Sequence, residues 1–268
     1  MKIGFLITAR LKSSRLKLKL LKPLNHKTVI EHVIKRAKTI QKCDEIVLCT
    51  SQLSQDSPLV KKALKNGISY YTGSDEDVLQ RLLEATELFK LDYFIGITAD
   101  NPLFSTYHAN LLIDLILSNP EVDFAYTSGM PIGLNMYVIK AKALKTVCAY
   151  KEEKDTEIWG YLINRPEIFN ITELPVNEQY IIKGVDRLTL DYQEDYELFK
   201  RIFGAFDKDE VIDILDVYEF LDANKELKEL NNRKEQLDIS KEAKTRISKF
   251  FEMNKERILA IKEEIYKV

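Results

Sequence analysis

The chain has 268 residues, of which 45% are hydrophobic and 31% are charged, so it has the composition of an ordinary globular protein and not of a disordered one. Its formal net charge of -2 lacks the strong positive field with which proteins bind nucleic acids or anionic membranes. No apolar run reaches membrane-spanning length. We therefore expect no nucleic-acid or membrane partner, and any cationic site has to be local.

The three cysteines, Cys43, Cys49 and Cys148, are an odd number without the spacing of metal ligands. They are interpreted as buried, reduced thiols. The apolar run at residues 3–8 is shorter than the hydrophobic region of a signal peptide, and no small-residue cleavage site follows it. These features favour a cytoplasmic location.

Up to about Phe203, short β-rich runs alternate with helical patterns, which is typical of βαβ units around a mainly parallel sheet. Strands are expected at residues 2–8, 45–50, 69–71, 93–98, 124–126, 134–140, 169–174 and 187–190. Helices are expected at residues 28–41, 57–66, 75–90, 106–119, 154–164 and 193–203. The element order predicts an α/β domain over residues 1–204.

Residues 205–268 differ in character, because they contain neither glycine nor proline and are rich in Glu, Lys, Leu and Ile. Helices are expected near residues 208–224 and 239–266, which makes this part a helical C-terminal extension. The second helix carries an apolar stripe that includes Ile247, Phe251 and Ile258. Such a stripe favours packing against the host domain or a second subunit over a membrane or ligand surface.

The loop at residues 9–19 follows the first expected strand and is strongly cationic. Parallel-sheet enzymes bind ligands at the carboxyl ends of their strands, so a triphosphate is expected at such a loop. Guanidinium and ammonium groups form charge-assisted bonds with phosphate oxygens. Neither a glycine-rich dinucleotide fingerprint nor a Walker loop is present. On charge alone, a solvated basic loop and a phosphate-binding loop remain equally open.

The same loop resembles the Ala-Arg-x-x-Ser-x-Arg-x-Pro-Gly-Lys signature of the cytidylyltransferase family that makes CMP-activated acidic sugars, most closely its spore-coat polysaccharide branch. The matching positions are Ala9, Arg10, Ser13 or Ser14, Arg15 and Lys19. Lys17 and Leu18 stand in place of the Pro-Gly pair. Because glycine adopts positive φ readily and leucine rarely does, we expect the loop to follow a different path here.

The resemblance extends over three later blocks in the same order. Residues 72–81 resemble the family's Gly-Ser-x-x-Asp-Val-Leu-x-Arg block, residues 98–103 its Gly-Asp-x-Pro-Leu turn, and residues 187–195 its Arg-x-Thr-Val-Asp-x-x-Glu-Asp block. The resemblance implies a Rossmann-like, GT-A-like nucleotidyltransferase fold. It also implies nucleotide contacts from Ala9, Arg10, Ser13, Ser14, Arg15, Lys19, Ser74, Asp77, Arg81 and Asp100.

Asp100 and Asp191 each follow an expected strand, so they can meet at one edge of the sheet although they are far apart in sequence. Mg²⁺ typically takes one or two carboxylates and completes its shell with water and substrate phosphates. By resemblance, these two aspartates are the metal ligands. A turn or helix-cap role remains open for each of them, and Glu194 or Asp195 could supply part of the charge assigned to Asp191.

The implied reaction is attack of an acceptor oxygen on the α-phosphorus of CTP, with Mg²⁺ bound and pyrophosphate as the leaving group. Arg10, Arg15 and Lys19 would neutralise the departing phosphates. Arg15, Lys19 and Asp100 are the expected catalytic residues. By resemblance, the enzyme is also expected to be a homodimer that serves surface polysaccharide biosynthesis.

The acceptor is expected to bind near residues 127–186, where the chain departs from the family. Ile132, Asn135 and Tyr137 replace positions that are usually Asp, Asp and Glu, whereas Glu157 is retained. A less acidic pocket repels an anion less, so we expect an acidic sugar, a sugar or polyol phosphate, or a phosphonate. The expected acceptor-binding residues are Asn135, Tyr137, Glu157 and Arg187.

Two other readings remain open. A glycosyltransferase that uses a nucleotide sugar has a related fold, but it usually presents an Asp-x-Asp motif, and residues 98–100 contain a single acid. A nucleotide-binding scaffold, inactivated by the substitution at Lys17 and Leu18, is the third reading. Pyrophosphate release from CTP separates the transferase from both alternatives.

Overall fold

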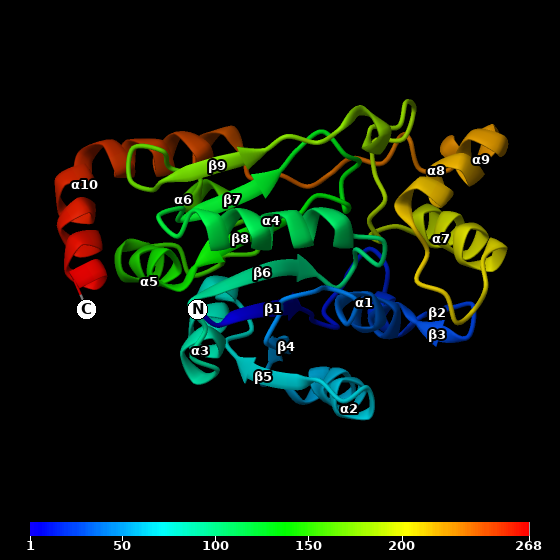
Figure 1. The fold of residues 1–268 in the computed structure, drawn as a ribbon, viewed down its shortest axis with the longest axis horizontal. Coiled ribbons are helices and arrows are strands. Elements are labelled where there is room, and N and C mark those ends of the chain that lie inside the picture. Colours follow the sequence, from blue (N-terminus) through cyan, green and yellow to red (C-terminus); the bar gives the residue numbers. More distant parts are fainter. Residues whose placement is uncertain (268) are drawn as a thin grey trace.

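The centre of the molecule is a seven-stranded sheet with the strand order β5-β4-β1-β6-β8-β7-β9 (Figure 1). This computed structural model describes residues 1–267. The sheet strands are β1 (Ile3–Thr8), β4 (Glu45–Ser51), β5 (Ser69–Gly73), β6 (Tyr93–Thr98), β7 (Phe124–Thr127), β8 (Tyr137–Lys140) and β9 (Ile171–Leu174). A separate two-stranded hairpin is formed by β2 (Pro23–Leu24) and β3 (Lys27–Thr28).

The half of the sheet that includes β5, β4, β1 and β6 is parallel, whereas β8 runs antiparallel to both of its neighbours. Thr8 at the end of β1 lies opposite Thr98 at the end of β6. The loops that follow these two strands therefore start side by side at the same edge of the sheet. The predicted α/β fold with a mainly parallel, Rossmann-like sheet is confirmed.

Helices cover both faces of the sheet (Figure 1). The helices are α1 (Val29–Ala37), α2 (Ser57–Lys65), α3 (Val78–Leu88), α4 (Thr106–Ser118), α5 (Ala141–Tyr150), α6 (Gly160–Ile163), α7 (Gln193–Ala205), α8 (Ile214–Ala223), α9 (Lys225–Lys228) and α10 (Lys241–Lys267). Alternate residues of β1 point to opposite faces. Phe5 and Ile7 belong to the core cluster that includes residues of α1, α4 and α7, whereas Leu6 belongs to the cluster that includes residues of α3, α5 and α10.

Two of the expected strands differ from the structure. Residues 187–190 form no strand, and Arg187 makes only an isolated bridge with Ile132. The amides of Leu188 and Leu190 donate to two different segments, to the carbonyls of Ile132 and Asp100, so no continuous strand ladder forms. The strand expected at residues 134–140 begins only at Tyr137, because Gly133 has a φ of 100° and the chain turns there.

The helix expected at residues 154–164 is limited to Gly160–Ile163. The backbone before it is irregular, and the hydroxyl of Thr156 there accepts a hydrogen bond from the Leu79 amide in the first turn of α3. The helix α5 (Ala141–Tyr150) was not expected from the sequence. It begins directly after β8, where the sequence carries no capping side chain to mark a helix start.

The C-terminal helix α10 packs against α5 and α6 of the same chain. Its apolar stripe supplies Ile247, Phe251 and Ile258 to the core on that face of the sheet. Packing against the host domain, one of the two expected roles, is thus confirmed. The stripe consequently no longer argues for a second subunit. Among residues 1–267, no helix combines the length and apolar character needed to span a membrane.

Leu18 adopts the left-handed conformation that glycine favours, with φ 53° and ψ 30°. It occupies the glycine position of the Pro-Gly pair, and it precedes the short 3₁₀ turn at Lys19–Leu21. The left-handed backbone conformation, which we expected to be absent once leucine replaces glycine, is therefore present at Leu18. Its side chain is 53% exposed, so little packing compensates for the steric cost.

We predict that Leu18→Gly stabilises the protein by up to about 1 kcal/mol, because removal of Cβ relieves the left-handed strain by more than the added chain entropy costs. Denaturant unfolding measures this difference. Leu18→Ala is the matched control, since it keeps Cβ and should change stability less. A glycine variant less stable than the alanine variant would contradict the prediction.

His108, in α4, is buried beside the rings of Tyr107 and Tyr180, and its Nδ1 lies 2.7 Å from the hydroxyl of Ser105. Burial lowers the pKa of His108 to about 4. In the unfolded chain the His108 ring binds a proton as pH falls through about 6.5. In the folded chain the ring stays neutral until pH falls to about 4. Stability from His108 is therefore present above that pH and is lost as pH falls toward about 4.

We predict that His108→Gln flattens the dependence of unfolding free energy on pH between about 6.5 and 4. Chemical denaturation at several pH values measures the slope. His26 is exposed, so His26→Gln serves as the control and should keep the wild-type slope. Equal slopes for His108→Gln and the wild type would show that another group causes the acid sensitivity.

Candidate functional site

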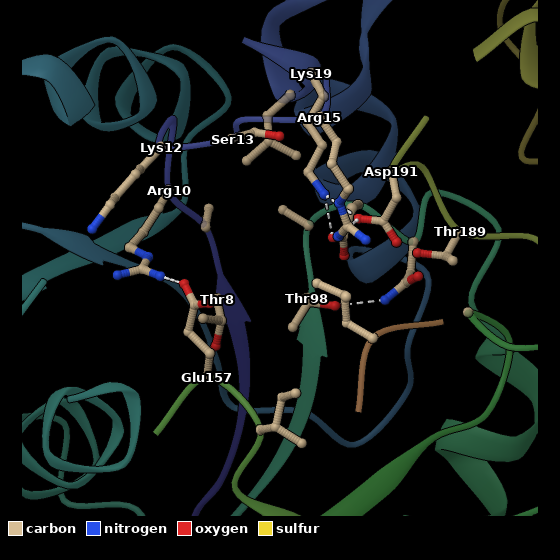
Figure 2. Close-up of a pocket in the computed structure, with 18 of the residues that line it drawn as sticks. Thr8, Arg10, Lys12, Ser13, Arg15, Lys19, Thr98, Glu157, Thr189 and Asp191 are labelled. Carbon is tan, nitrogen blue, oxygen red and sulfur yellow. Dashed lines mark hydrogen bonds and ion pairs between the residues drawn. The ribbon is translucent and has the colours of Figure 1, made fainter. Parts of the chain in front are cut away.

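A cavity of about 500 Å³ opens at the carboxyl ends of β1 and β6. Its walls combine the loop after β1, the start of α3, the turn after β6 and four segments from later in the chain (Figure 2). Of the predicted site residues, the cavity is lined by Ala9, Arg10, Ser13, Ser14, Arg15, Lys19, Asp100, Glu157 and Asp191. The parallel pairing of the two strands thus brings together residues that are far apart in sequence.

Lys19 joins the two aspartates that were expected to bind a metal. Its Nζ lies 2.6 Å from Oδ2 of Asp100 and 2.9 Å from Oδ1 of Asp191. Arg15 also contacts Asp191, with an Nη2–Oδ1 distance of 2.9 Å. In Figure 2 the Arg15 and Lys19 side chains converge on Asp191 from the same side of the cavity. The loop after β1 is therefore held against the turn after β6 by ion pairs.

The charges of this cluster stabilise one another despite burial. Burial alone would raise the pKa of Asp100, but the adjacent Lys19 ammonium outweighs it and holds the carboxyl pKa below its usual value. Burial also opposes the charge of Lys19, and here the Asp100 and Asp191 carboxylates outweigh it and raise the pKa of the ammonium. Both groups are therefore charged at neutral pH.

Asp191 is itself positioned by a buried network at the start of α7. Arg187 Nη2 lies 3.1 Å from Asp191 and 2.9 Å from Asp195. Asp195 accepts hydrogen bonds from the backbone amides of Asp191 and Tyr192. Asn231, from the C-terminal part of the chain, donates to Asp195 at 2.8 Å. Arg187 thus lies behind the cavity wall, where it fixes Asp191.

The residues fit a divalent cation by their chemistry. Oδ1 of Asp100 is buried and has no hydrogen-bond partner among residues 1–267. Asp191 supplies a second carboxylate to the same cluster. Two carboxylates with room for substrate phosphates form the ligand set that Mg²⁺ uses in nucleotide enzymes. Within residues 1–267, no group of three or more potential His, Cys, Asp or Glu ligands occurs, so the remaining ligands would come from substrate and water.

Arg10 lies on the opposite side of the cavity from Lys19 (Figure 2). Its guanidinium contacts the backbone carbonyl of Asp75 and the carboxylate of Glu157. Glu157 belongs to the irregular segment before α6 and faces the cavity. An arginine already held by a carbonyl and a carboxylate is fixed in place, so its orientation requires little reordering when an anionic ligand binds.

The predicted residues of the second block support the site from outside the cavity. Ser74 accepts a hydrogen bond from the amide of Asp77 at 3.0 Å, and Asp77 caps α3 through the amide of Gln80. Arg81 is fully buried and donates to the carbonyl of Ser74. Val78 is the residue of this block that lines the cavity. The block therefore fixes the start of α3 beside Arg10.

Of the four predicted acceptor-binding residues, Glu157 alone lines the cavity. Asn135 donates to the carbonyl of Met130 at 2.9 Å, which fixes the loop before β8. Tyr137 packs edge-on against Trp159 with 4.9 Å between ring centroids. Tyr137 thus lies behind Trp159, and Arg187 lies behind Asp191. Both residues hold in place a side chain that lines the cavity, without lining it themselves.

The cavity residues that were not among the predicted site residues are Thr8, Lys12, Leu20, Val78, Thr98, Ala99, Asn101, Ile132, Gly133, Ile158, Trp159, Thr189, Gln236 and Leu237. Asn101 and Thr189 lie inside recognised motifs, so their proximity could have been inferred from the neighbouring Asp100 and Asp191. Gln236 and Leu237 carry no motif. Their position depends on how residues 229–240 cross from α9 to α10, which no local pattern indicates.

The fold and this site together define a nucleotidyltransferase. A cationic loop after the first strand faces a pair of carboxylates at the edge of a mainly parallel sheet. The model of the cytidylyltransferase family matches residues 5–245. The chain belongs to this family, as the motif order predicted.

Two curated proteins show the same relationship along most of the chain. The uncharacterised protein MJ1063 of Methanocaldococcus jannaschii is 31% identical over 234 residues, covering 87% of this chain and 95% of that protein. The spore coat polysaccharide biosynthesis protein SpsF of Bacillus subtilis is 28% identical over 208 residues, covering 75% of this chain and 86% of SpsF. The predicted resemblance to the spore-coat branch is confirmed.

A solved structure has the same fold over nearly the whole chain. The cytidylyltransferase from Leptospira borgpetersenii serovar Hardjo-bovis superposes with a TM-score of 0.79 at 26% identity. The match covers 89% of this chain and all of the Leptospira chain. Most of the C-terminal part therefore lies within the architecture that the two proteins share.

We predict that Arg187→Met lowers the free energy of unfolding by about 3 kcal/mol, because it removes the positive charge that balances the buried carboxylates of Asp191 and Asp195. Denaturant unfolding provides the measurement. The control is Lys200→Met, which breaks an exposed pair with Glu197 and should cost less than about 1 kcal/mol. Similar losses in the two variants would mean that the buried network contributes no special stability.

Proposed function

We propose that the protein transfers CMP from CTP to a small anionic acceptor and releases pyrophosphate. The observation that supports this most strongly is the contact of Lys19 with both Asp100 and Asp191, beside Arg15, at the edge of the sheet. Phosphoryl and nucleotidyl transfer depend chiefly on positioning and charge stabilisation, and this cluster supplies both signs of charge within one cavity.

In the proposed reaction, Arg15 and Lys19 donate hydrogen bonds to the β- and γ-phosphates and stabilise the negative charge that grows on pyrophosphate as it leaves. Lys12, which also lines the cavity, adds positive charge to the same loop. Asp100 and Asp191 would hold Mg²⁺. When bound, this ion neutralises the α-phosphate and lowers the barrier to attack by the acceptor oxygen. Ser13 and Ser14 contribute hydroxyl groups toward the phosphates.

The acceptor is proposed to be an acidic sugar, a sugar or polyol phosphate, or a phosphonate. An acceptor that already carries an ionised oxygen needs no strong base, which agrees with the absence of a histidine from the cavity wall among residues 1–267. The name of SpsF supports a role in polysaccharide biosynthesis. We further propose a cytoplasmic enzyme that acts as a homodimer, whose mass light scattering would measure.

We predict that CTP, among the four ribonucleoside triphosphates, gives pyrophosphate release with Mg²⁺ and a member of a panel of acidic sugars, phosphorylated polyols and phosphonates. A coupled pyrophosphate assay measures the rate. The same panel with CTP and no added metal is the control and should give no release. No release with any triphosphate would contradict the proposed function and favour a nucleotide-binding scaffold.

We predict that Asp100→Asn lowers turnover by at least about 100-fold, because the amide removes a negative charge from the cation site and from Lys19. Steady-state pyrophosphate release measures the loss. Asp114→Asn, an equivalent change at a surface pair with Lys42, should retain wild-type turnover. Unchanged turnover in Asp100→Asn would remove Asp100 from the catalytic site.

A further inference from the structure

The wall of the polar cavity also contains exposed apolar side chains. Ile132 is 40% exposed, Ile158 is 39% exposed and Leu237 is 59% exposed, and all three line the cavity that holds Asp100 and Asp191. Exposed apolar residues are common when scattered singly over a surface. Gathered in a ligand cavity, they form a surface that gains free energy when an apolar part of a ligand covers it.

These three residues belong to segments that the rest of the structure holds in place. Ile132 forms a bridge with Arg187, and Ile158 precedes Trp159, whose ring packs on Tyr137. Leu237 lies in the crossing segment, residues 229–240, which joins α9 to α10 and runs along the molecule between them (Figure 1).

The crossing segment is attached to the same network that positions Asp191. Asn231 donates to Asp195, and the hydroxyl of Tyr192 donates to the carbonyl of Glu235 at 3.3 Å. Farther along, the hydroxyl of Tyr161 donates to Asp238 at 2.9 Å. Leu237 is therefore held at the cavity between the hydrogen bonds at Glu235 and Asp238. It is exposed although the backbone on both sides of it is attached to the rest of the protein.

Asn101 adds an unpaired polar atom to this part of the cavity. Its Nδ2 donates to the hydroxyl of Thr98 at 2.6 Å, whereas its Oδ1 is buried and has no partner among residues 1–267. A Cβ at Gly133 would lie 2.8 Å from Oδ1, so the amide oxygen packs against this glycine and a larger residue there would displace it. A buried acceptor without a donor is costly, and a ligand O–H or N–H at this position would remove that cost.

The geometry points to an acceptor subsite formed by Asn101, Ile132, Ile158 and Leu237. It takes an anionic acceptor in which a hydroxyl or amide N–H lies next to an apolar substituent. The hydroxyl or N–H group of this acceptor donates a hydrogen bond to Asn101 Oδ1, and its apolar substituent covers the three aliphatic side chains. None of the four residues belongs to the cationic loop at residues 9–19, which is left to the triphosphate. This inference rests on the proposed function and specifies its acceptor.

The apolar part of the subsite is tested with methyl-, ethyl- and propylphosphonate as probes, in the presence of Mg²⁺ and the α,β-methylene analogue of CTP. Trp159 is the single tryptophan and lines the cavity, so its fluorescence reports binding. We expect wild-type affinity to increase about threefold to fourfold with each added CH₂. Leu237→Ser should flatten this increase without weakening binding of the nucleotide analogue.

Leu230→Ser is the matched control for this experiment. Leu230 is an exposed leucine of the same crossing segment but does not line the cavity, so this variant should keep the wild-type increase. Three results would overturn the apolar subsite: no increase with chain length in the wild type, an unchanged increase in Leu237→Ser, or weaker binding of the nucleotide analogue alone in that variant. The last result would assign Leu237 to the nucleotide.

The polar part is tested by comparing 2-hydroxyethylphosphonate with ethylphosphonate. We expect the wild type to bind the hydroxylated probe about 10-fold more tightly, because its O–H pairs with Asn101 Oδ1. Asn101→Leu, of similar volume, should remove this preference while keeping the gain from longer alkyl chains. Equal binding of the two probes by the wild type would overturn the assignment of Asn101.

The subsite and the proposed function can be contradicted independently of each other. The subsite is judged from the affinities of phosphonates, which need no turnover. The proposed function is judged from pyrophosphate release. A wild-type protein that releases pyrophosphate but shows no dependence on chain length would retain the transferase activity and lose the apolar subsite.

Discussion

The ammonium group of Lys19 is the interaction on which the site depends. It comes from the loop after β1 and binds carboxylates that follow β6 and precede α7. Without a cation between them, Asp100 and Asp191 would place two negative charges in a partly buried position, at a high electrostatic cost. The same ammonium prevents the loop from moving away from the sheet. Charge neutralisation and loop placement are therefore achieved by a single side chain.

This arrangement also explains why the second carboxylate has such extensive support. Asp191 lies at the junction of an irregular segment and α7, where backbone alone gives little rigidity. Arg187 and the capping carboxylate Asp195 fix it from behind, and Asn231 ties this pair to the C-terminal part of the chain. The chain thus reinforces one metal-binding candidate with residues from three separate regions, whereas Asp100 is placed directly by the end of β6.

The sequence was most informative where a local pattern determines structure. Short β-rich apolar runs located β1 and β6. The loop between β1 and α1 could be placed at the sheet edge because parallel strands share their carboxyl ends. The expected strand at 187–190 was wrong because its backbone bonds to two separate segments, at Ile132 and at Asp100, which only tertiary packing brings together. Tyr137 and Arg187 were interpreted as ligand contacts from their motifs, yet burial places them behind the wall. Only tertiary packing distinguishes a residue that lines a cavity from one that supports its wall.

The crossing segment runs from α9 to α10 (Figure 1). Leu227 of α9 packs against the core on one face of the sheet, whereas α10 packs into the core on the other face. Most side chains of this segment are not buried and contribute little to the folding core; Asn231, which donates to Asp195, is the buried exception. Substitutions at the exposed positions of this segment, such as Leu237, alter the lining of the cavity at a small cost in stability. Relatives with this architecture can therefore diversify what they accept by changing a short surface stretch, while the charged centre and the sheet beneath it stay the same.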